Sequence, residues 1–293
     1  MKTAPLPVPP PSPRHLHEVL DLEQLDTNLF RSRVNQVGGN RSLYGGQILG
    51  QGLKAAALTA PAGRTAHSLH GYFLLPGMCD IPVIYDVELT RDGGSFSTRR
   101  VVARQRARPI FHMELSFHRE EQGFEHELAP EVDVPDPEQL ASMQALVESY
   151  ADRVPDDLAQ MQPTVELRPI CPEDFFLRKA ARSRCLYWLK SASPLPADSL
   201  THAAALAYLS DYFLVFTALL EHKESTFSRD VRVASLDHAM WFHRSCRADE
   251  WLLIEAASPF AGGARGLTRG QIYDRDRRLV ASVAQEGMMR RIE

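Results

Sequence analysis

The sequence has few cysteines, no large excess of charge of either sign and only one long apolar run. Its 293 residues include four cysteines, none of them in a C-x-x-C pair, so neither a zinc motif nor a redox motif is indicated. Four cysteines are also too few for a disulfide-stabilised secreted fold. The formal net charge of −4 lacks the basic excess of dedicated nucleic-acid-binding proteins. We therefore expect reduced thiols, no nucleic-acid partner and no bound metal or cofactor.

Several familiar catalytic motifs are absent as well. The sequence has no P-loop, no dinucleotide-binding glycine motif, no G-x-S-x-G and no H-E-x-x-H, which removes the main support for nucleotide, serine-hydrolase and zinc-protease chemistry. His238 and His243 stand five residues apart near Asp237, but no third ligand accompanies them. We interpret the two histidines as strand-end residues near the surface.

Neither end of the given sequence carries a recognisable targeting signal. Six of the 20 prolines fall within the first 13 residues, with no apolar stretch like that of a secretory signal, so residues 1–16 are expected to form a disordered arm. The chain ends in Arg290-Arg291-Ile292-Glu293, which is not the peroxisomal S-K-L signal. The expected location is the cytoplasm.

Hydrophobic patterning predicts two similar blocks. A helix is expected after Tyr44-Gly45-Gly46-Gln47 and through Leu58, and a shorter amphipathic helix over 17–29. Strands are predicted over 68–75, 82–91, 96–106 and 109–118, and again over 183–190, 232–236, 240–242, 251–257, 266–274 and 279–288. Ser68-Leu69 and Ser235-Leu236 open matching segments at an offset of 167 residues. This order predicts a duplicated unit.

The segment between the blocks is acidic. Residues 125–157 contain ten acidic residues and one basic residue, Arg153, with four prolines, so residues 128–164 are predicted to link a domain over 17–127 to a domain over 165–293. A helix over 137–154 is possible within this linker.

The one long apolar run lies in the second block. From Ala203 to Leu220 only Ser210, Asp211 and Thr217 are polar. A central Asp costs about 2.5–3.5 kcal/mol in a bilayer, so we expect no membrane span but a buried helix over 200–220. A helix that is apolar on every side must be covered on every side, which a curved antiparallel sheet can do. The predicted class is α+β, with two such units whose sheets join edge to edge.

Three groups of segments give the sequence its clearest resemblance. They are residues 43–51 with 67–77 (LYGGQILGQ and HSLHGYFLLPG), residues 91–100 (RDGGSFSTRR), and residues 235–244 with 283–287 (SLDHAMWFHR and VAQEG). In this order they resemble the type II acyl-CoA thioesterases, the double-hotdog family. The resemblance implies a tandem double hotdog, with one long central helix in each half and the catalytic residues in the C-terminal half.

The resemblance also implies a reaction and a site. Members hydrolyse fatty acyl-CoA, with medium or long chains expected here, to free acid and CoA without a metal. Their Asp, Thr or Ser, and Gln around one water correspond to Asp211, Ser235 and Gln285. On the same pattern Asp237 and His238 have structural roles and stay outside the site.

The resemblance leaves several alternatives open. A non-catalytic acyl-CoA-binding protein of the same fold is the main alternative, whereas a hotdog dehydratase would need a histidine within the central helix, and His202 lies only at its start. No carboxylate occupies the matching place in the first block, near Gly46-Gln47, so we expect one site per chain, with the first half as scaffold or substrate wall.

Exposed sheet edges favour a homo-oligomer, a dimer or tetramer. Arg99, Arg100, Arg265 and Arg269 are candidate partners of the CoA phosphates, although solvated strand arginines are the commoner case.

Overall fold

The computed structural model of the chain describes residues 13, 15–38, 42–127, 133–154, 164–176, 184–222, 224, 227–228 and 230–292. The expected proline-rich arm over residues 1–16 lies almost entirely outside the described residues. The predicted acidic linker over residues 128–164 is described only in part. Its bounds therefore stay a prediction.

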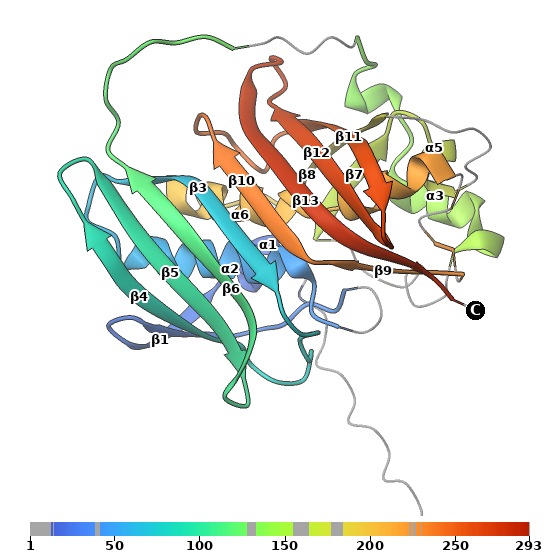
Figure 1. Cartoon of the computed structure of the whole chain (residues 1–293). Helices are drawn as coiled ribbons and strands as arrows, with labels where there is room; N and C mark the ends of the chain where they lie inside the picture. The colour runs from blue at the N-terminus through green and yellow to red at the C-terminus, as the bar shows by residue number, and fades with distance from the viewer. Residues whose placement is uncertain are drawn as a thin grey trace, which may run out of the picture.

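One curved antiparallel sheet spans both halves of the described chain (Figure 1). The first half supplies β1 Leu22–Asp26, β2 Leu29–Ser32, β3 Thr65–Phe73, β4 Ile84–Asp92, β5 Phe96–Gln105 and β6 Arg108–His118. The second half supplies β7 Val165–Pro169, β8 Arg184–Ser191, β9 Val231–Ser235, β10 Asp237–Phe242, β11 Leu252–Gly262, β12 Arg265–Tyr273 and β13 Leu279–Arg291. The strand order is β1-β2-β4-β5-β6-β3-β10-β13-β12-β11-β8-β7, with β9 paired to β13.

The two halves mirror each other outward from the β3–β10 junction. From that junction the order is β3, β6, β5, β4, β2, β1 on one side and β10, β13, β12, β11, β8, β7 on the other. Asp237 faces Tyr72 and Trp241 faces Ser68 across the junction. The backbone hydrogen bonds of what would be two edge strands are thereby satisfied within one sheet. The predicted tandem hotdog, with sheets joined edge to edge, is confirmed.

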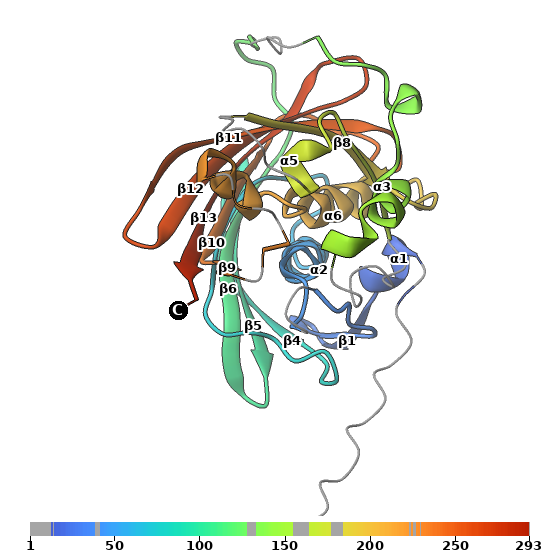
Figure 2. The same ribbon diagram turned by 90° about the vertical axis from the view of Figure 1, so that its right-hand side faces the viewer.

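Two central helices lie side by side on the concave face of the sheet (Figure 2). They are α2, Gly45–Leu58, and α6, Ser199–Ser210, whose N-cap Asp198 accepts a hydrogen bond from Thr201 N at 2.8 Å. The helices run antiparallel, because Gly46 approaches the carbonyl of Tyr208 and Gly50 that of Ala204. A methyl group on Gly50 would lie only 2.7 Å from the Ala204 oxygen. Glycine on this face therefore lets the two backbones meet directly.

The predicted single helix over 200–220 is wrong in one respect that matters. α6 ends at Ser210, Asp211 is its C-cap, and a separate 3-10 helix, η4, covers Val215–His222. Between them Phe213 adopts a left-handed conformation with φ of 59°, which costs a residue with a bulky side chain about 1–3 kcal/mol. The apolar window within 199–222 is 78% buried in the fold, as expected for a core helix.

Two shorter predictions are also corrected. In place of the helix predicted over residues 17–29 there is only the four-residue helix α1, Leu16–Val19, before the chain turns into the β1–β2 hairpin. The possible helix over 137–154 is broken into η2 Pro137–Gln139, α3 Met143–Ser149 and η3 Ala151–Arg153. A further short helix, α5, covers Glu173–Phe176. Segments this short bury too little apolar surface to stabilise one continuous long helix.

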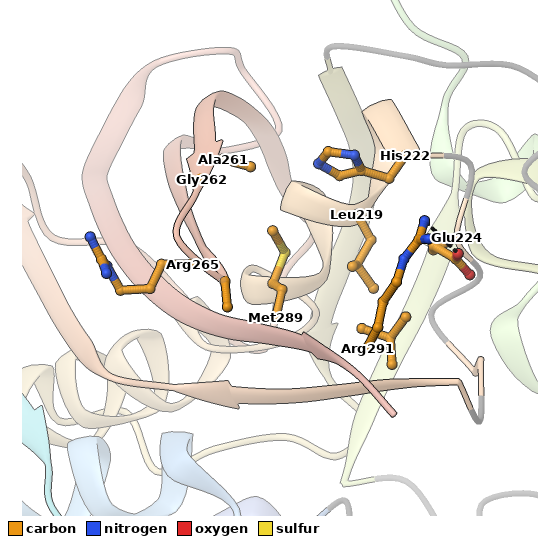
Figure 3. Close-up of a pocket in the computed structure, with 10 residues that line it drawn as sticks. Leu219, His222, Glu224, Ala261, Gly262, Arg265, Met289 and Arg291 are labelled. Carbon is orange, nitrogen blue, oxygen red and sulfur yellow. Dashed lines mark ion pairs between the residues drawn. The ribbon is translucent and has the colours of Figure 1, made fainter. Parts of the chain in front are cut away.

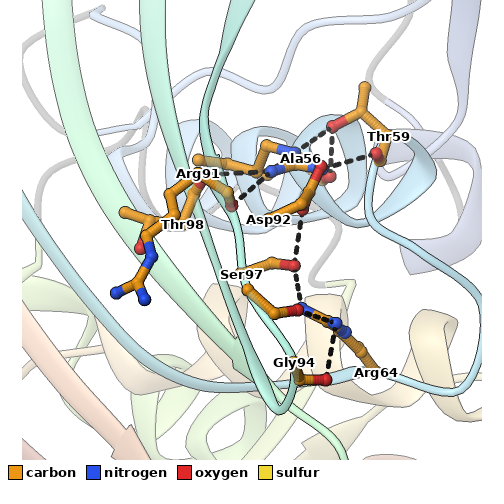
Figure 4. Close-up of polar contacts among 10 residues, drawn as sticks. Ala56, Thr59, Arg64, Arg91, Asp92, Gly94, Ser97 and Thr98 are labelled. Atoms are coloured by element: carbon orange, nitrogen blue, oxygen red, sulfur yellow. Dashed lines mark hydrogen bonds and ion pairs between the residues drawn. The ribbon is translucent and has the colours of Figure 1, made fainter.

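A buried arginine explains the RDGGSFSTRR segment. The side chain of Arg99 is 0% exposed and its Nη2 donates to both carboxylate oxygens of Asp92, at 2.9 and 3.0 Å. Nη2 also donates to the Thr59 carbonyl at the C-terminus of α2. Asp92 further accepts from Ser97 in the same cluster (Figure 4). Arg99 is thus a helix-end and hairpin support, and it is not available to the phosphates of CoA.

Candidate active site

Asp211 lies where the second central helix stops. Its exposed fraction is only 8%, and its backbone has left the helix by the next residue, since Tyr212 N bonds back to Leu209. Ser210 contributes to this ending, because its hydroxyl donates to the Ala207 carbonyl at 2.8 Å and so competes with the helical backbone. The break therefore places a carboxylate at a helix terminus in the core.

Two donors from different halves hold the Asp211 carboxylate. Gln285 Nε2 on β13 donates to its Oδ1 at 2.7 Å. The backbone N–H of Gly46, in the first turn of α2, donates to the same carboxylate, where the helix dipole favours negative charge. Burial raises the pKa of Asp211 to about 7, against the lowering effect of these two hydrogen bonds. At neutral pH a large part of the group is therefore ionised, and the carboxylate is unusually basic for an aspartate.

His238 lies beside this group and is only 1% exposed, so the expectation that it lies near the surface is wrong. Its Nδ1 lies 3.2 Å from Gln285 Nε2 and 3.8 Å from Asp211 Oδ1, and its Nε2 lies 2.9 Å from Ser210 Oγ. Burial lowers the pKa of His238 to about 3, so the imidazole is neutral beside the carboxylate. Asp237, its neighbour, behaves as predicted, because Oδ1 accepts from Glu286 N at 2.7 Å.

A β-bulge explains why alternation along the chain does not reveal His238. Ser235 pairs with Gly287 and Ala239 pairs with Ala284, so four steps on one strand match three on the other. The extra residue reverses the inward and outward alternation. As a result His238 and Met240 point into the core, where they are 1% and 0% exposed. Unbroken alternation from the inward-facing Ser235 would instead turn both side chains outward.

Ser235, the third predicted site residue, lies on the same face of the sheet as Gln285. Its partner Gly287 is two residues from Gln285 along β13, and residues two apart face the same side. Diagonal neighbours of this kind lie roughly 7–8 Å apart between Cα atoms. Among these three described side chains, Asp211 and Gln285 touch, whereas the Ser235 hydroxyl bonds to neither.

The first half forms part of the site, as expected. A methyl group on Gly45 would lie 2.6 Å from Asp211 Oδ2 and 3.1 Å from the ring of Phe73. Phe73 N in turn donates to the Leu236 carbonyl at 2.9 Å, next to Ser235. The helix start and the end of β3 thus form a wall of the site.

A separate pocket of about 210 Å³ lies at the far end of η4 (Figure 3). Its lining includes Leu219, His222, Arg265, Met289 and Arg291. Met289 is four residues beyond Gln285, or roughly 13 Å along the strand. Arg265 and Arg291 pair with Glu286 and Glu224. The pocket is distinct from the Asp211 group, and among the described residues no His, Cys, Asp and Glu cluster could hold a metal.

Both halves match models of one protein family. Residues 34–118 match the acyl-CoA thioesterase N-terminal domain, and residues 156–288 match the acyl-CoA thioesterase model. The chain is 38% identical over 284 residues to acyl-coenzyme A thioesterase 8 of Homo sapiens, covering 93% of this chain and 88% of that protein. It is 35% identical over 280 residues to acyl-CoA thioesterase 2 of Haemophilus influenzae, covering 94% and 97%.

Solved structures agree with this. The acyl-CoA thioesterase II TesB2 from Mycobacterium marinum superposes with a TM-score of 0.77 at 39% identity, covering 94% of this chain and 98% of that one. A hot dog protein of unknown function from Alicyclobacillus acidocaldarius gives a TM-score of 0.76 at 20% identity, which supports the fold alone. The chain belongs to the type II acyl-CoA thioesterases, a family of tandem double-hotdog proteins.

Proposed function

We propose that this chain hydrolyses fatty acyl-CoA thioesters of medium or long chain, using a water molecule activated by Asp211 and positioned by Gln285 and Ser235. The observation that carries the proposal is the buried Asp211–Gln285 pair, with Asp211 Oδ1 accepting from Gln285 Nε2 at 2.7 Å. Burial raises the pKa of the carboxyl to about 7, which suits a general base that works near neutral pH.

In the proposed reaction the water oxygen attacks the thioester carbonyl carbon while Asp211 accepts a proton from the water. The carbon–sulfur bond then breaks, the CoA thiolate leaves, and the proton on Asp211 is available to it or to solvent. A thioester is electrophilic enough for water to serve as the nucleophile once a base assists. General-base assistance of this kind is worth about 10²–10⁴ in rate.

The Ser235 hydroxyl has a defined place in this proposal. It shares the inner face of the sheet with Gln285 and lies diagonal to it. A gap of that size is suited to a bridging water. Ser235 would then hold the water from the side opposite the Asp211–Gln285 pair.

The test is thiol release from a panel of acyl-CoA esters of increasing chain length. The wild-type protein should release CoA, and Asp211→Asn should lower kcat by at least about 10²-fold because it removes the base and keeps its volume. Ser235→Ala and Gln285→Ala should each lower kcat, and Ser235→Thr, which keeps the hydroxyl, should retain substantial activity.

Three results would overturn parts of this proposal. Tight binding of acyl-CoA without thiol release would make the protein a non-catalytic binder of the same ligand. Near-wild-type turnover in a folded Asp211→Asn protein would remove Asp211 as the base. Unchanged kcat in both Ser235→Ala and Gln285→Ala would show that these two residues do not hold the water.

A further inference from the structure

The amide oxygen of Gln285 has no partner in the part of the chain that the structure describes. Gln285 is 0% exposed, and its Oε1 is buried without a hydrogen bond. Its Nε2, by contrast, has two neighbours, Asp211 Oδ1 and His238 Nδ1. An amide nitrogen has two hydrogens to donate. Both can therefore be used, and Oε1 is left as an unused acceptor beside Asp211 and His238.

The protonation state of His238 follows from its other neighbour. The Ser210 hydroxyl has one hydrogen, which it donates to the Ala207 carbonyl at 2.8 Å. The contact of 2.9 Å between Ser210 Oγ and His238 Nε2 must then have the imidazole as donor. The neutral ring therefore carries its hydrogen on Nε2, and Nδ1 is a bare acceptor. A bare Nδ1 matches the N–H of Gln285, whereas the Oε1 of a flipped amide would repel it.

We propose that His238 is a positioning residue that fixes the orientation of the Gln285 amide, so that Oε1 accepts a hydrogen bond from the hydrolytic water. The inference rests on the proposed function, because it assigns His238 a part in that same reaction. The chain of contacts runs from the Ala207 carbonyl through Ser210 and His238 to Gln285. It ties the end of α6 to the amide on β13.

His238 matters most once Asp211 has taken up a proton. While Asp211 is ionised, its Oδ1 by itself requires the Gln285 nitrogen rather than the oxygen as its partner. A protonated Asp211 can donate, so it would accept either orientation of the amide. Nδ1 of His238 accepts in both states and keeps the amide from turning over during the catalytic cycle.

Two matched variants separate this role from simple packing. In His238→Asn the side-chain oxygen can occupy the place of Nδ1 and accept from Gln285, but the contact to Ser210 is lost. In His238→Gln the longer side chain can reach Ser210 in place of Nε2, but leaves Gln285 without its acceptor. We expect His238→Asn to keep kcat within about threefold of wild type and His238→Gln to lower it about tenfold or more, with little change in KM.

A double-mutant cycle tests whether the effect passes through Gln285. On a Gln285→Ala background, His238→Gln should change kcat by less than about twofold, because the amide that it positions is already absent. Thermal unfolding of each variant shows whether it is folded. If His238→Gln does not fold, Ser210→Ala replaces it in the cycle. Loss of the Ser210 hydroxyl removes the acceptor that keeps the imidazole hydrogen on Nε2.

The outcomes are distinct. Loss in His238→Gln, rescue in His238→Asn and no further loss on Gln285→Ala support the inference. The reverse order, with His238→Gln active and His238→Asn impaired, would show that the bond to Ser210 is what matters and would overturn it. Equal losses on both backgrounds would overturn it too. If Gln285→Ala itself has full activity, Gln285 does not hold the water and the inference is overturned, whereas absence of thiol release by the wild-type protein would instead overturn the proposed function.

Discussion

At the scale of single residues, the candidate site places a carboxylate in surroundings that favour its neutral form. Asp211 is buried at the C-terminal end of α6, where the dipole of that helix disfavours negative charge. Gln285 and the Gly46 N–H offset part of that cost. The balance leaves the pKa of Asp211 at about 7, so its charge state changes across the neutral range. Stability and activity should therefore respond to pH in opposite directions.

Stability should be higher without the charge. The pKa of Asp211 is about 7 in the folded state and near its ordinary value of 3.8 when unfolded, so the folded state binds the extra proton. Stability then falls as pH rises from about 4 to about 7. Asp211→Asn removes this penalty and should be more stable than wild type at pH 8 by roughly 2–4 kcal/mol. Unfolding at pH 8 and pH 4 measures it, and the difference should shrink at pH 4. Destabilisation at pH 8 would contradict this account.

Activity should have the opposite pH dependence. Only the ionised carboxylate can accept a proton from water, so kcat/KM should fall as pH drops through about 7, with a single acid limb. The neighbouring titratable groups, His238, Tyr44, Tyr187 and Tyr208, do not add a limb in this range, because burial lowers the pKa of the histidine to about 3 and raises those of the tyrosines well above 10. A profile flat from pH 5 to 8 would exclude Asp211 as the base.

At the scale of elements, the contact between α2 and α6 decides where Asp211 stands. Glycines on α2 let the start of one helix meet the end of the other, which brings the Gly46 N–H to the carboxylate. Tyr44, the N-cap of α2, adds a hydrogen bond from its hydroxyl to the Tyr208 carbonyl at 3.1 Å. The same helix pair therefore serves both the core and the site.

Two glycines of α2 should tolerate alanine differently. A methyl group on Gly46 would overlap the Tyr208 carbonyl, which is backbone and cannot turn aside, whereas one on Gly52 would meet the end of the Met113 side chain. Met is flexible and can move. Gly46→Ala should lose about 2–4 kcal/mol of unfolding free energy, and Gly52→Ala should change it by less than about 1 kcal/mol. Denaturant titration of both variants decides; equal losses would mean that the helix contact is not the constraint.

At the scale of the whole molecule, the two halves share one sheet and one pair of central helices. The β3–β10 junction and the α2–α6 contact both cross between the halves. The main hydrophobic cluster correspondingly includes residues from both halves, such as Leu53, Phe111, Leu206 and Ile254, and a smaller cluster around Trp188 and Trp251 lies beside it. A protein built in this way should unfold as a unit rather than half by half.

This cooperativity can be measured by destabilising the first half and following the unfolding of the second. All three tryptophans, Trp188, Trp241 and Trp251, lie in the second half, so fluorescence reports on that half, and circular dichroism reports on both. Arg99→Lys in the first half loses the paired contact to Asp92 and should cost about 2–4 kcal/mol. It should shift the fluorescence and dichroism midpoints equally.

Arg100→Lys is the control for that measurement. Its side chain is 47% exposed and its Nη1 lies 3.8 Å from Glu88 Oε2. A surface pair of this kind is worth at most about 1 kcal/mol. The midpoints should barely move. Unequal shifts in Arg99→Lys, with fluorescence unchanged, would mean that the halves unfold independently.

The amino-acid sequence by itself determined the type and order of most elements. Alternation of apolar residues predicted the four strands from β3 to β6 to within three residues at each end. The helix expected after Gln47 and through Leu58 is confirmed, although it begins earlier, at Gly45. The apolar run around Asp211 required a covered helix, because each of its faces must be buried. The family motifs pointed to Asp211 and Gln285, which lie 74 residues apart in the chain and 2.7 Å apart in the fold.

Only the tertiary structure decided how the site is assembled. The helix breaks at Asp211 without glycine or proline, because packing around Phe213, whose ring meets Phe175 at 5.2 Å, holds a strained turn that local propensity disfavours. The bulge after Ser235 turns His238 inward, and no local pattern records a bulge, since it is set by the register with β13. The Gly46 N–H reaches Asp211 across the two halves. Contacts of this range depend on the packing of whole elements, which periodicity along one segment does not describe.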